Sequence, residues 1–423
     1  MRPLSVYIHI PFCVRKCAYC DFLSFPEDQG PGEAGKLQGR YFDALLAETD
    51  AAAEKLKRDS AAAVLVRCVY FGGGTPSLSD PERIREVLTR LEERFAFSED
   101  AEISFECNPG TASCDKLQEL RRAGIGRLSI GVQSFDDTEL QLLGRIHTAS
   151  QAVRCFEDAR AAGFDNINID LMAALPGQTR ESLLGSVRQA VSLAPEHLSL
   201  YSLIIEEGTP FYERYAGEVP DPHFDRRDPD RADTGLSHLP DEITEREMLH
   251  AAWKELAAAG YERYEISNFA LRGRRCRQNL TCWERGEYLG LGLGAASLLD
   301  ETRFSNTRDL HRYLEAFRGS VPAEEKTLSG GEQTEPLSRI RENTEHLSAA
   351  SQMEEFMFLG LRLTEGVREE RFAAAFGRSV DEVYGEVLEK HIRDGLLMRA
   401  DGRIFLTDYG TDISNYVMAK FLL

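Results

Sequence analysis

Apolar residues in the first half of the chain alternate between two kinds of pattern. Short, nearly continuous apolar runs rich in β-branched residues predict buried parallel strands. Longer stretches with apolar residues three and four positions apart predict amphipathic helices. The predicted strands cover residues 6–10, 64–71, 102–106, 127–133, 166–171 and 197–204. The helices predicted among them cover residues 41–58, 81–95, 116–123, 138–143, 150–162 and 181–193.

Strands that alternate with helix-length segments predict right-handed βαβ units and therefore a parallel sheet. We expect an α/β fold in which this sheet curves into a partial (β/α)6 barrel, an incomplete relative of the eight-fold TIM-like barrel. In such sheets the functional residues lie at the C-terminal ends of the strands. Most of the chemically unusual residues of this chain fall at those positions.

The periodicity weakens after residue 208, which predicts a change of organisation. We predict a core barrel over residues 1–220, an accessory region extending it over 221–320, a polar linker over 321–350 and a small C-terminal domain over 351–423. Within the accessory region, residues 221–241 are rich in Asp, Arg and Pro and predict a solvated insertion. In the C-terminal segment, three helical patterns followed by two short strands predict a winged-helix-like module.

The composition, with 42% hydrophobic and 28% charged residues, is typical of a globular protein. The formal net charge of −20 argues against nucleic acid as a partner, because phosphate binding needs a basic surface. The longest apolar stretch, residues 288–299, is too short and too rich in glycine to cross a bilayer. No apolar signal segment follows the N-terminus, so we expect a cytoplasmic protein that is not an integral membrane protein.

Three of the nine cysteines, Cys13, Cys17 and Cys20, share one loop directly after the first predicted strand. In a reducing compartment this group indicates metal binding or catalysis rather than disulfides. One interpretation is a structural zinc site completed by His9 or a distant cysteine, but zinc favours paired CxxC elements, which the chain lacks at suitable spacing. The interpretation that we favour is a cubane iron–sulfur cluster with one iron open to a further ligand.

Polar and glycine residues at the other strand ends suit a small polar ligand. Residues 72–75 are Gly-Gly-Gly-Thr, and they allow a ligand to approach the backbone closely. Glu106 and Asp170 suit a cationic amine and a ribose diol, Arg145 suits a carboxylate, and Gln133 suits an uncharged polar edge. Each of these alone is more often a turn, a cap or an ion-pair residue. Together they match an amino acid joined to a nucleoside, as in S-adenosylmethionine (SAM).

The motifs of this chain resemble those of a known family. They are Cys13-xxx-Cys17-xx-Cys20-Asp21-Phe22, Gly72-Gly73-Gly74-Thr75-Pro76, Gly131-Val132-Gln133-Ser134, Leu143-Gly144-Arg145-Ile146-His147-Thr148, Asn168-Ile169-Asp170-Leu171, Leu175-Pro176-Gly177-Gln178-Thr179, Glu207-Gly208-Thr209-Pro210, Glu355-Phe356-Met357 and Leu361-Arg362-Leu363. Together they resemble the radical SAM superfamily, specifically its oxygen-independent coproporphyrinogen III oxidase-like family and, within that, the HemW heme chaperones. The resemblance covers nearly the whole chain.

The resemblance implies a [4Fe–4S] cluster on Cys13, Cys17 and Cys20, with the fourth iron chelated by the amino and carboxylate groups of SAM. An electron from the cluster then cleaves the sulfonium to give a 5′-deoxyadenosyl radical, so the resemblance also implies an electron donor. The positions that match the SAM contacts of the family are Tyr7, Tyr19, Gly73, Gly74, Thr75, Glu106, Gln133, Arg145 and Asp170.

Small differences within the family separate chaperones from the enzymes. The coproporphyrinogen dehydrogenases continue with Gly-Cys after the third cluster cysteine and carry an extended N-terminal segment. This chain has Asp21-Phe22, and its first strand begins at once. We therefore expect a heme chaperone that passes heme to an acceptor, with an oxygen-independent coproporphyrinogen III oxidase as the alternative. A third interpretation is an electron-transfer or zinc-stabilised scaffold without radical chemistry.

One departure from the chaperone pattern concerns heme. The family is associated with a His-Asn-x-x-Tyr-Trp heme motif after Cys-Arg, but here Gln278 replaces the histidine and Cys282 replaces the tyrosine. Glutamine is a poor iron ligand. Cys276 or Cys282 can ligate heme iron as a thiolate, or both can be buried packing residues. The sequence leaves these two interpretations open.

Overall fold

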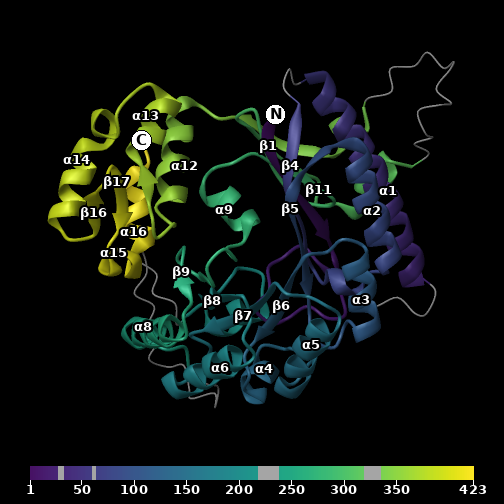
Figure 1. Cartoon of the computed structure of the whole chain (residues 1–423), viewed down its shortest axis with the longest axis horizontal. Coiled ribbons are helices and arrows are strands. Elements are labelled where there is room, and N and C mark those ends of the chain that lie inside the picture. The colour runs from purple at the N-terminus through teal and green to yellow at the C-terminus, as the bar shows by residue number, and fades with distance from the viewer. Residues whose placement is uncertain (27–32, 60–62, 218–237, 319–334) are drawn as a thin grey trace.

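The computed structural model describes residues 1–26, 33–59, 63–217, 238–318 and 335–423 (Figure 1). Most of the predicted insertion at 221–241, and residues 321–334 of the predicted linker, lie outside the described residues. None of the described helices is both long and apolar enough to cross a membrane.

Six parallel strands form the centre of the fold, as the hydrophobic pattern predicts. They are β1 (Arg2–Ile10), β4 (Val64–Gly73), β5 (Ala96–Cys107), β6 (Arg127–Gln133), β7 (Ile167–Ala173) and β8 (His197–Ser202). Each strand pairs in parallel with the next one in this order. The α/β fold and its partial barrel are therefore confirmed.

The helices between these strands cover the outer side of the curved sheet (Figure 1). They are α1 (Glu33–Asp59), α2 (Pro81–Arg94), α3 (Cys114–Arg122), α4 (Asp137–Leu142), α5 (Ala149–Ala161) and α6 (Arg180–Ser192). From α2 to α6, each helix start has a side-chain cap in the sequence. In α2, for example, the Asp80 side chain accepts a hydrogen bond from the Glu82 amide at 2.9 Å, and Pro81 occupies the first turn.

The two faces of the sheet differ in polarity. Along β6, Leu128, Ile130 and Val132 belong to the apolar core between sheet and helices. The alternate residues Ser129 and Gln133 face the inside of the barrel and line a cavity there. Closed barrels usually fill their interior with branched apolar side chains. The polar interior of this barrel therefore leaves room for a polar ligand.

Further strands extend the sheet at both edges to a total of 12 strands among the described residues; the strand next to β1 is parallel to it, and the others pair antiparallel with their neighbours. Beside β1 lie β11 (Tyr288–Leu291), β12 (Ala296–Leu299), β13 (Thr302–Asn306) and β14 (Arg341–His346); beside β8 lie β10 (Asn268–Ala270) and β9 (Glu262–Arg263). The helices of this region are α7 (Pro210–Tyr215), α8 (Glu242–Ala258), α9 (Arg277–Trp283) and α10 (Leu310–Ala316).

The predicted linker at 321–350 is wrong for its described part. Residues 336–346 form α11 (Pro336–Ile340) and the edge strand β14, which pairs with β13. The six residues of β14 are Arg-Glu-Asn-Thr-Glu-His, and four of them are exposed. An edge strand that buries neither face needs no apolar residues, and charges protect it from pairing with other chains. Its polar sequence therefore resembles a linker.

The C-terminal domain has its own apolar core. Its elements are α12 (Ala349–Gly360), β15 (Val367–Arg368), α13 (Glu369–Phe376), α14 (Val380–Arg393), β16 (Leu397–Ala400), β17 (Arg403–Leu406), α15 (Asp408–Asp412) and α16 (Ser414–Met418). Three helices and a small sheet of order β15-β17-β16 confirm the winged-helix-like arrangement. The domain boundaries near residues 220 and 350 remain a prediction.

Ion pairs of the buried Glu355 carboxylate hold this domain to the barrel. Glu355, on α12, pairs with Arg285 at 3.0 Å and with Arg303 at 2.7 Å. The guanidinium of Arg362 lies 4.2 Å from the ring centroid of Trp283, at the end of α9. In Figure 1, α9 lies between the barrel strands and the C-terminal domain.

Candidate functional site

The cysteine loop follows β1 and is fixed from several sides. Cys13 belongs to β2 (Phe12–Cys13), which pairs with β3 (Phe25–Pro26). The amide of Ala18 donates to the Leu143 carbonyl at 3.0 Å, and the Ala18 carbonyl accepts from the Phe211 amide at 3.0 Å. The loop that carries Cys17 and Cys20 is therefore held in place by segments distant in the sequence.

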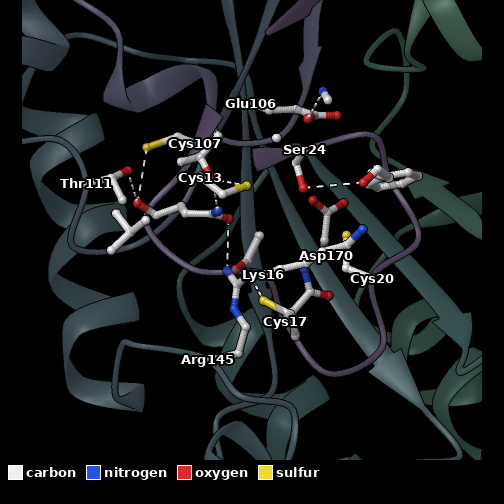
Figure 2. A pocket seen from close by; sticks show the side chains of 18 of the residues that line it. Cys13, Lys16, Cys17, Cys20, Ser24, Glu106, Cys107, Thr111, Arg145 and Asp170 are labelled. Atoms are coloured by element: carbon white, nitrogen blue, oxygen red, sulfur yellow. Dashed lines mark hydrogen bonds between the residues drawn. The ribbon is translucent and has the colours of Figure 1, made fainter. Parts of the chain in front are cut away.

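A cavity of about 290 Å³ lies between this loop and the C-terminal ends of the strands. Figure 2 shows Cys13, Cys17, Cys20 and Asp170 around it. The predicted site residues that line it are Cys13, Cys17, Tyr19, Cys20, Gly73, Gly74, Thr75, Glu106, Gln133, Arg145 and Asp170. The structure thus brings these residues together; their individual roles remain predictions.

Tyr7 is the predicted site residue that does not line the cavity. Its hydroxyl lies 3.1 Å from His9 Nδ1, and its ring stacks on Tyr70 with 6.3 Å between centroids. Tyr70 does line the cavity. Tyr7 therefore supports the cavity wall from behind.

A chain of polar contacts connects two of the three cysteines. Arg145 Nη1 lies 3.6 Å from Cys17 Sγ, and Nη2 donates to Asn108 Oδ1 at 2.9 Å. Asn108 Nδ2 donates to Thr75 Oγ1 at 3.0 Å, and that hydroxyl contacts Cys13 Sγ at 3.4 Å. Sequence reasoning missed Asn108 as a site residue. Its position directly after β5 was the available signal, because polar residues at strand ends face the site.

The carboxyl group of Glu106 is held at the cavity by two donors. Tyr70 OH donates to Oε1 at 2.9 Å, and the Gly73 amide donates to Oε2 at 3.1 Å. Burial, together with the nearby charge of Asp170, raises the pKa of Glu106 to about 7. A cationic ligand at this position would favour the ionised form.

Asp170 is a second partly buried carboxyl group facing the same cavity. Burial raises its pKa above the ordinary value. It accepts hydrogen bonds from Asn168 Nδ2 at 2.7 Å and from Ser129 Oγ at 3.2 Å, which fix its orientation. Two partly buried carboxyl groups and one guanidinium around the same cavity give a site suited to a ligand with both cationic and anionic groups.

The glycines after β4 allow the strand to approach the cysteine loop. The Gly74 amide donates to the Ile10 carbonyl at 2.8 Å. A Cβ atom at Gly74 would lie 2.7 Å from the Phe12 carbonyl oxygen. Gly73 has φ +116°, a conformation that favours glycine. These glycines are therefore required by the close packing of two chain segments, in addition to any ligand contact.

Gln133, at the end of β6, has a strained backbone. Its φ is +72°, and the pairing of β6 with β7 shifts register between Gly131 and Gln133. The Gln133 side chain accepts a hydrogen bond from Tyr201 OH at 2.9 Å. Strained residues of this kind concentrate at functional sites, where surrounding contacts hold them in place.

The donor set fits an iron–sulfur cluster. In the part of the chain that the structure describes, no group of three His, Cys, Asp or Glu side chains is arranged to hold a single metal ion. His9 is not free to complete a zinc site, because Nε2 contacts the Leu23 carbonyl at 2.7 Å and Nδ1 contacts Tyr7. Three thiols around one cavity instead suit a wider, sulfur-ligated group with one open coordination position.

The segment matching the heme motif lies elsewhere, on α9. Gln278 accepts hydrogen bonds from Ser5 Oγ and, at 3.6 Å, from Cys68 Sγ. Ser5 belongs to the first half of β1, whereas the cysteine loop follows the end of that strand. Cys276 is 1% exposed, and burial raises its pKa to about 12. This geometry is that of a packing cysteine.

Two family models match the chain. The radical SAM superfamily model matches residues 7–190, and the HemN C-terminal domain model matches residues 347–413. Among solved structures, coproporphyrinogen III oxidase (HemN) from Escherichia coli, described as a radical SAM enzyme, is similar with a TM-score of 0.77. It is 23% identical, and the similarity covers 100% of this chain and 90% of that one. At this identity the likeness establishes the fold alone.

Curated relatives named heme chaperone HemW are similar over the full length. The protein from Lactococcus lactis is 36% identical, covering 100% of this chain and 98% of the relative. The one from Bacillus subtilis is 34% identical with 99% of both covered. The one from Escherichia coli is 33% identical, covering 100% of this chain and 99% of the relative.

Proposed function

This chain belongs to the HemW family of the radical SAM superfamily, and we propose that it is a heme chaperone, which binds heme and transfers it to an acceptor. The observation that carries the proposal is the identity of 33–36% to HemW proteins over the whole chain. The Asp21-Phe22 sequence after the cluster loop supports the same choice.

Membership of the radical SAM superfamily implies a [4Fe–4S] cluster and SAM. We assign Cys13, Cys17 and Cys20 as the cluster ligands. When bound, the cluster supplies a single electron for cleavage of the sulfonium of SAM. The protein binds and orients the two groups and excludes water from them.

The charged residues of the cavity are suited to different groups of SAM. Ionised Glu106 and Asp170 are suited to the ammonium group and the ribose hydroxyls. Arg145 is suited to the carboxylate, since its guanidinium already lies beside the cluster loop. Gly73 and Gly74 let the ligand approach the backbone at the end of β4. We propose a cytoplasmic protein, because the cluster thiols must stay reduced, and one that receives electrons from a donor.

Heme titration of the anaerobically reconstituted protein tests this function. We expect the heme Soret band to shift as a complex of equal stoichiometry forms. The Cys282→Ala variant is titrated in parallel, because it reports whether that thiol ligates the iron. An unshifted Soret band in the wild-type protein contradicts the chaperone proposal.

A second candidate is an oxygen-independent coproporphyrinogen III oxidase. It is favoured by one observation, the replacement of the heme-motif histidine by Gln278. Anaerobic incubation of the reconstituted protein with SAM, a reductant and coproporphyrinogen III distinguishes the two functions. Decarboxylated product would establish the enzyme, and its absence removes this candidate.

A further inference from the structure

The mouth of the cavity carries large apolar side chains that are exposed. Val14, Phe22, Ile146 and Ile204 are 49%, 66%, 52% and 68% exposed, respectively. The first three line the cavity. Ile204 is not itself a lining residue; it lies two residues beyond β8, whose Tyr201 lines the cavity. We call these four residues the apolar rim.

The rim is assembled from three separate parts of the chain. Val14 and Phe22 belong to the cysteine loop, Ile146 follows α4, and Ile204 follows β8. Single exposed apolar residues are normal on a protein surface, but several around one opening indicate a surface that contacts an apolar ligand or partner.

Two cations lie beside the rim in a chain of net charge −20. Arg15 and Lys16 are exposed and line the cavity. Arg15 Nη2 donates to the Gly144 carbonyl at 2.6 Å, which holds its guanidinium next to Ile146. Lys16 has no ion pair among the described residues; Asp21 is the acidic residue of the same loop. The loop therefore combines apolar surface with a net positive charge, which suits a flat apolar ligand with carboxylates.

The heme-motif segment on α9 offers no comparable surface. Gln278 is 9% exposed and Cys276 is 1% exposed. Arg362 covers the ring of Trp283. The pocket next to Trp283 has a volume of about 120 Å³, less than half of the 290 Å³ of the cavity at the strand ends. A porphyrin cannot enter this segment in the observed conformation.

We propose that the porphyrin of heme binds face-on to the apolar rim, with its propionates toward Arg15 and Lys16, and that the protein gives the iron no axial ligand there. The inference rests on the proposed chaperone function and names its binding surface. The cysteines of the loop are committed to the cluster, and His147, which also lines the cavity, is 4% exposed. Binding without an iron–protein bond leaves the heme free to be passed on.

Metal-free protoporphyrin IX distinguishes binding at the apolar rim from binding at a site that ligates the iron, because it has no iron to ligate. With full-length reconstituted protein, we expect fluorescence titration to give a Kd within about threefold of the Kd for heme. The double variant Ile146→Ser/Ile204→Ser lies outside the cysteine loop. It should weaken the binding of both ligands at least tenfold while the iron content stays unchanged. The matched control is Ile392→Ser/Met398→Ser, which changes exposed residues of the C-terminal domain and should leave both affinities unchanged.

The carboxylate contacts have their own test. Protoporphyrin IX dimethyl ester lacks free carboxylates. Lys16→Gln should therefore lower the affinity for protoporphyrin IX several-fold and leave the affinity for the ester unchanged. Equal effects of Lys16→Gln on both ligands contradict the proposed orientation.

Other outcomes would contradict the rim proposal and the chaperone proposal separately. If the wild-type protein binds heme but not protoporphyrin IX, or if Cys282→Ala rather than the rim variant weakens heme, the iron is ligated elsewhere and the rim proposal is wrong. In that case the chaperone function stands. If the wild-type protein binds neither ligand, the chaperone function itself is wrong.

Discussion

The guanidinium of Arg145 lies 3.6 Å from the Cys17 sulfur, although 128 residues separate the two in the chain. The contact joins the segment after α4 to the cluster loop. The guanidinium donates toward the sulfur and so helps to fix the orientation of the Cys17 side chain. The same residue therefore combines two tasks, stabilising the loop for the cluster and providing charge for the carboxylate of SAM.

Replacing Cys17 by Ala should abolish the cluster. With two thiols left on the loop, the reconstituted protein should lose its visible iron–sulfur absorbance and most of its iron. Iron and sulfide analysis after anaerobic reconstitution measures this. Cys114→Ala is the matched control, since Cys114 lies at the start of α3, outside the cavity lining. A Cys17→Ala protein that retains about four irons per chain would show that the ligands are misassigned.

Glu106 should make SAM binding dependent on pH. Its pKa of about 7 in the folded protein means that the carboxyl group is protonated below that pH. If the carboxylate contacts SAM, the affinity should rise by about tenfold per pH unit up to pH 7 and change little above it. Equilibrium binding from pH 5 to 9 measures this. Glu106→Gln should remove this pH dependence of the affinity for SAM, whereas substitution of the exposed Glu119 by Gln should leave it unchanged.

The same pKa predicts the sign of the effect on stability. The folded-state pKa of about 7 lies above the ordinary value of 4.5, so between these values the folded protein binds more protons than the unfolded chain. The contribution of Glu106 to stability should therefore decrease as pH rises from 4.5 to 7. Urea denaturation of the wild type and of Glu106→Gln between pH 4.5 and 7 measures this contribution as the difference in their free energies of unfolding. An identical pH dependence in the two proteins would contradict the raised pKa.

A methyl group at Gly74 should displace the cluster loop. The new Cβ would lie 2.7 Å from the Phe12 carbonyl oxygen, and backbone cannot yield as a side chain can. We expect Gly74→Ala to destabilise the protein by about 1–3 kcal/mol and to lower iron content after reconstitution. Gly185→Ala is the control: Gly185 lies inside α6 with no heavy atom within 4 Å of a new Cβ. It should stabilise the helix by about 1 kcal/mol.

Removing the Glu355 carboxylate should loosen the C-terminal domain. Arg285 and Glu355 are both nearly buried, so Glu355→Ala leaves a buried guanidinium with one partner fewer. We expect a loss of about 3 kcal/mol, measured by urea denaturation and followed by the fluorescence of Trp283 at this interface. Arg188→Ala removes a more exposed pair with Glu255 and should change the denaturation midpoint little. Similar effects of the two variants would contradict the role of the buried pair.

Some site features were not accessible from the sequence. The convergence of Asn108, Thr75 and Arg145 depends on the curvature of the sheet, which brings the ends of different strands together. The edge strand β14 looked like a linker because it buries no face. The place of Gln278, beside Ser5 on β1, depends on how α9 packs across the barrel.

The sequence by itself determined the parallel strands, their helices, the winged-helix-like module and the cysteine loop. These depend on apolar periodicity and on residues that are neighbours along the chain, so local patterns are sufficient to predict them. Only the tertiary structure decided that Tyr7 stands behind the cavity, that the heme-motif segment is closed, and that exposed apolar residues of the cysteine loop and of the segment after α4 line the cavity mouth. Such relationships join residues far apart in the chain, and they exist only after the sheet has curved and its loops have packed.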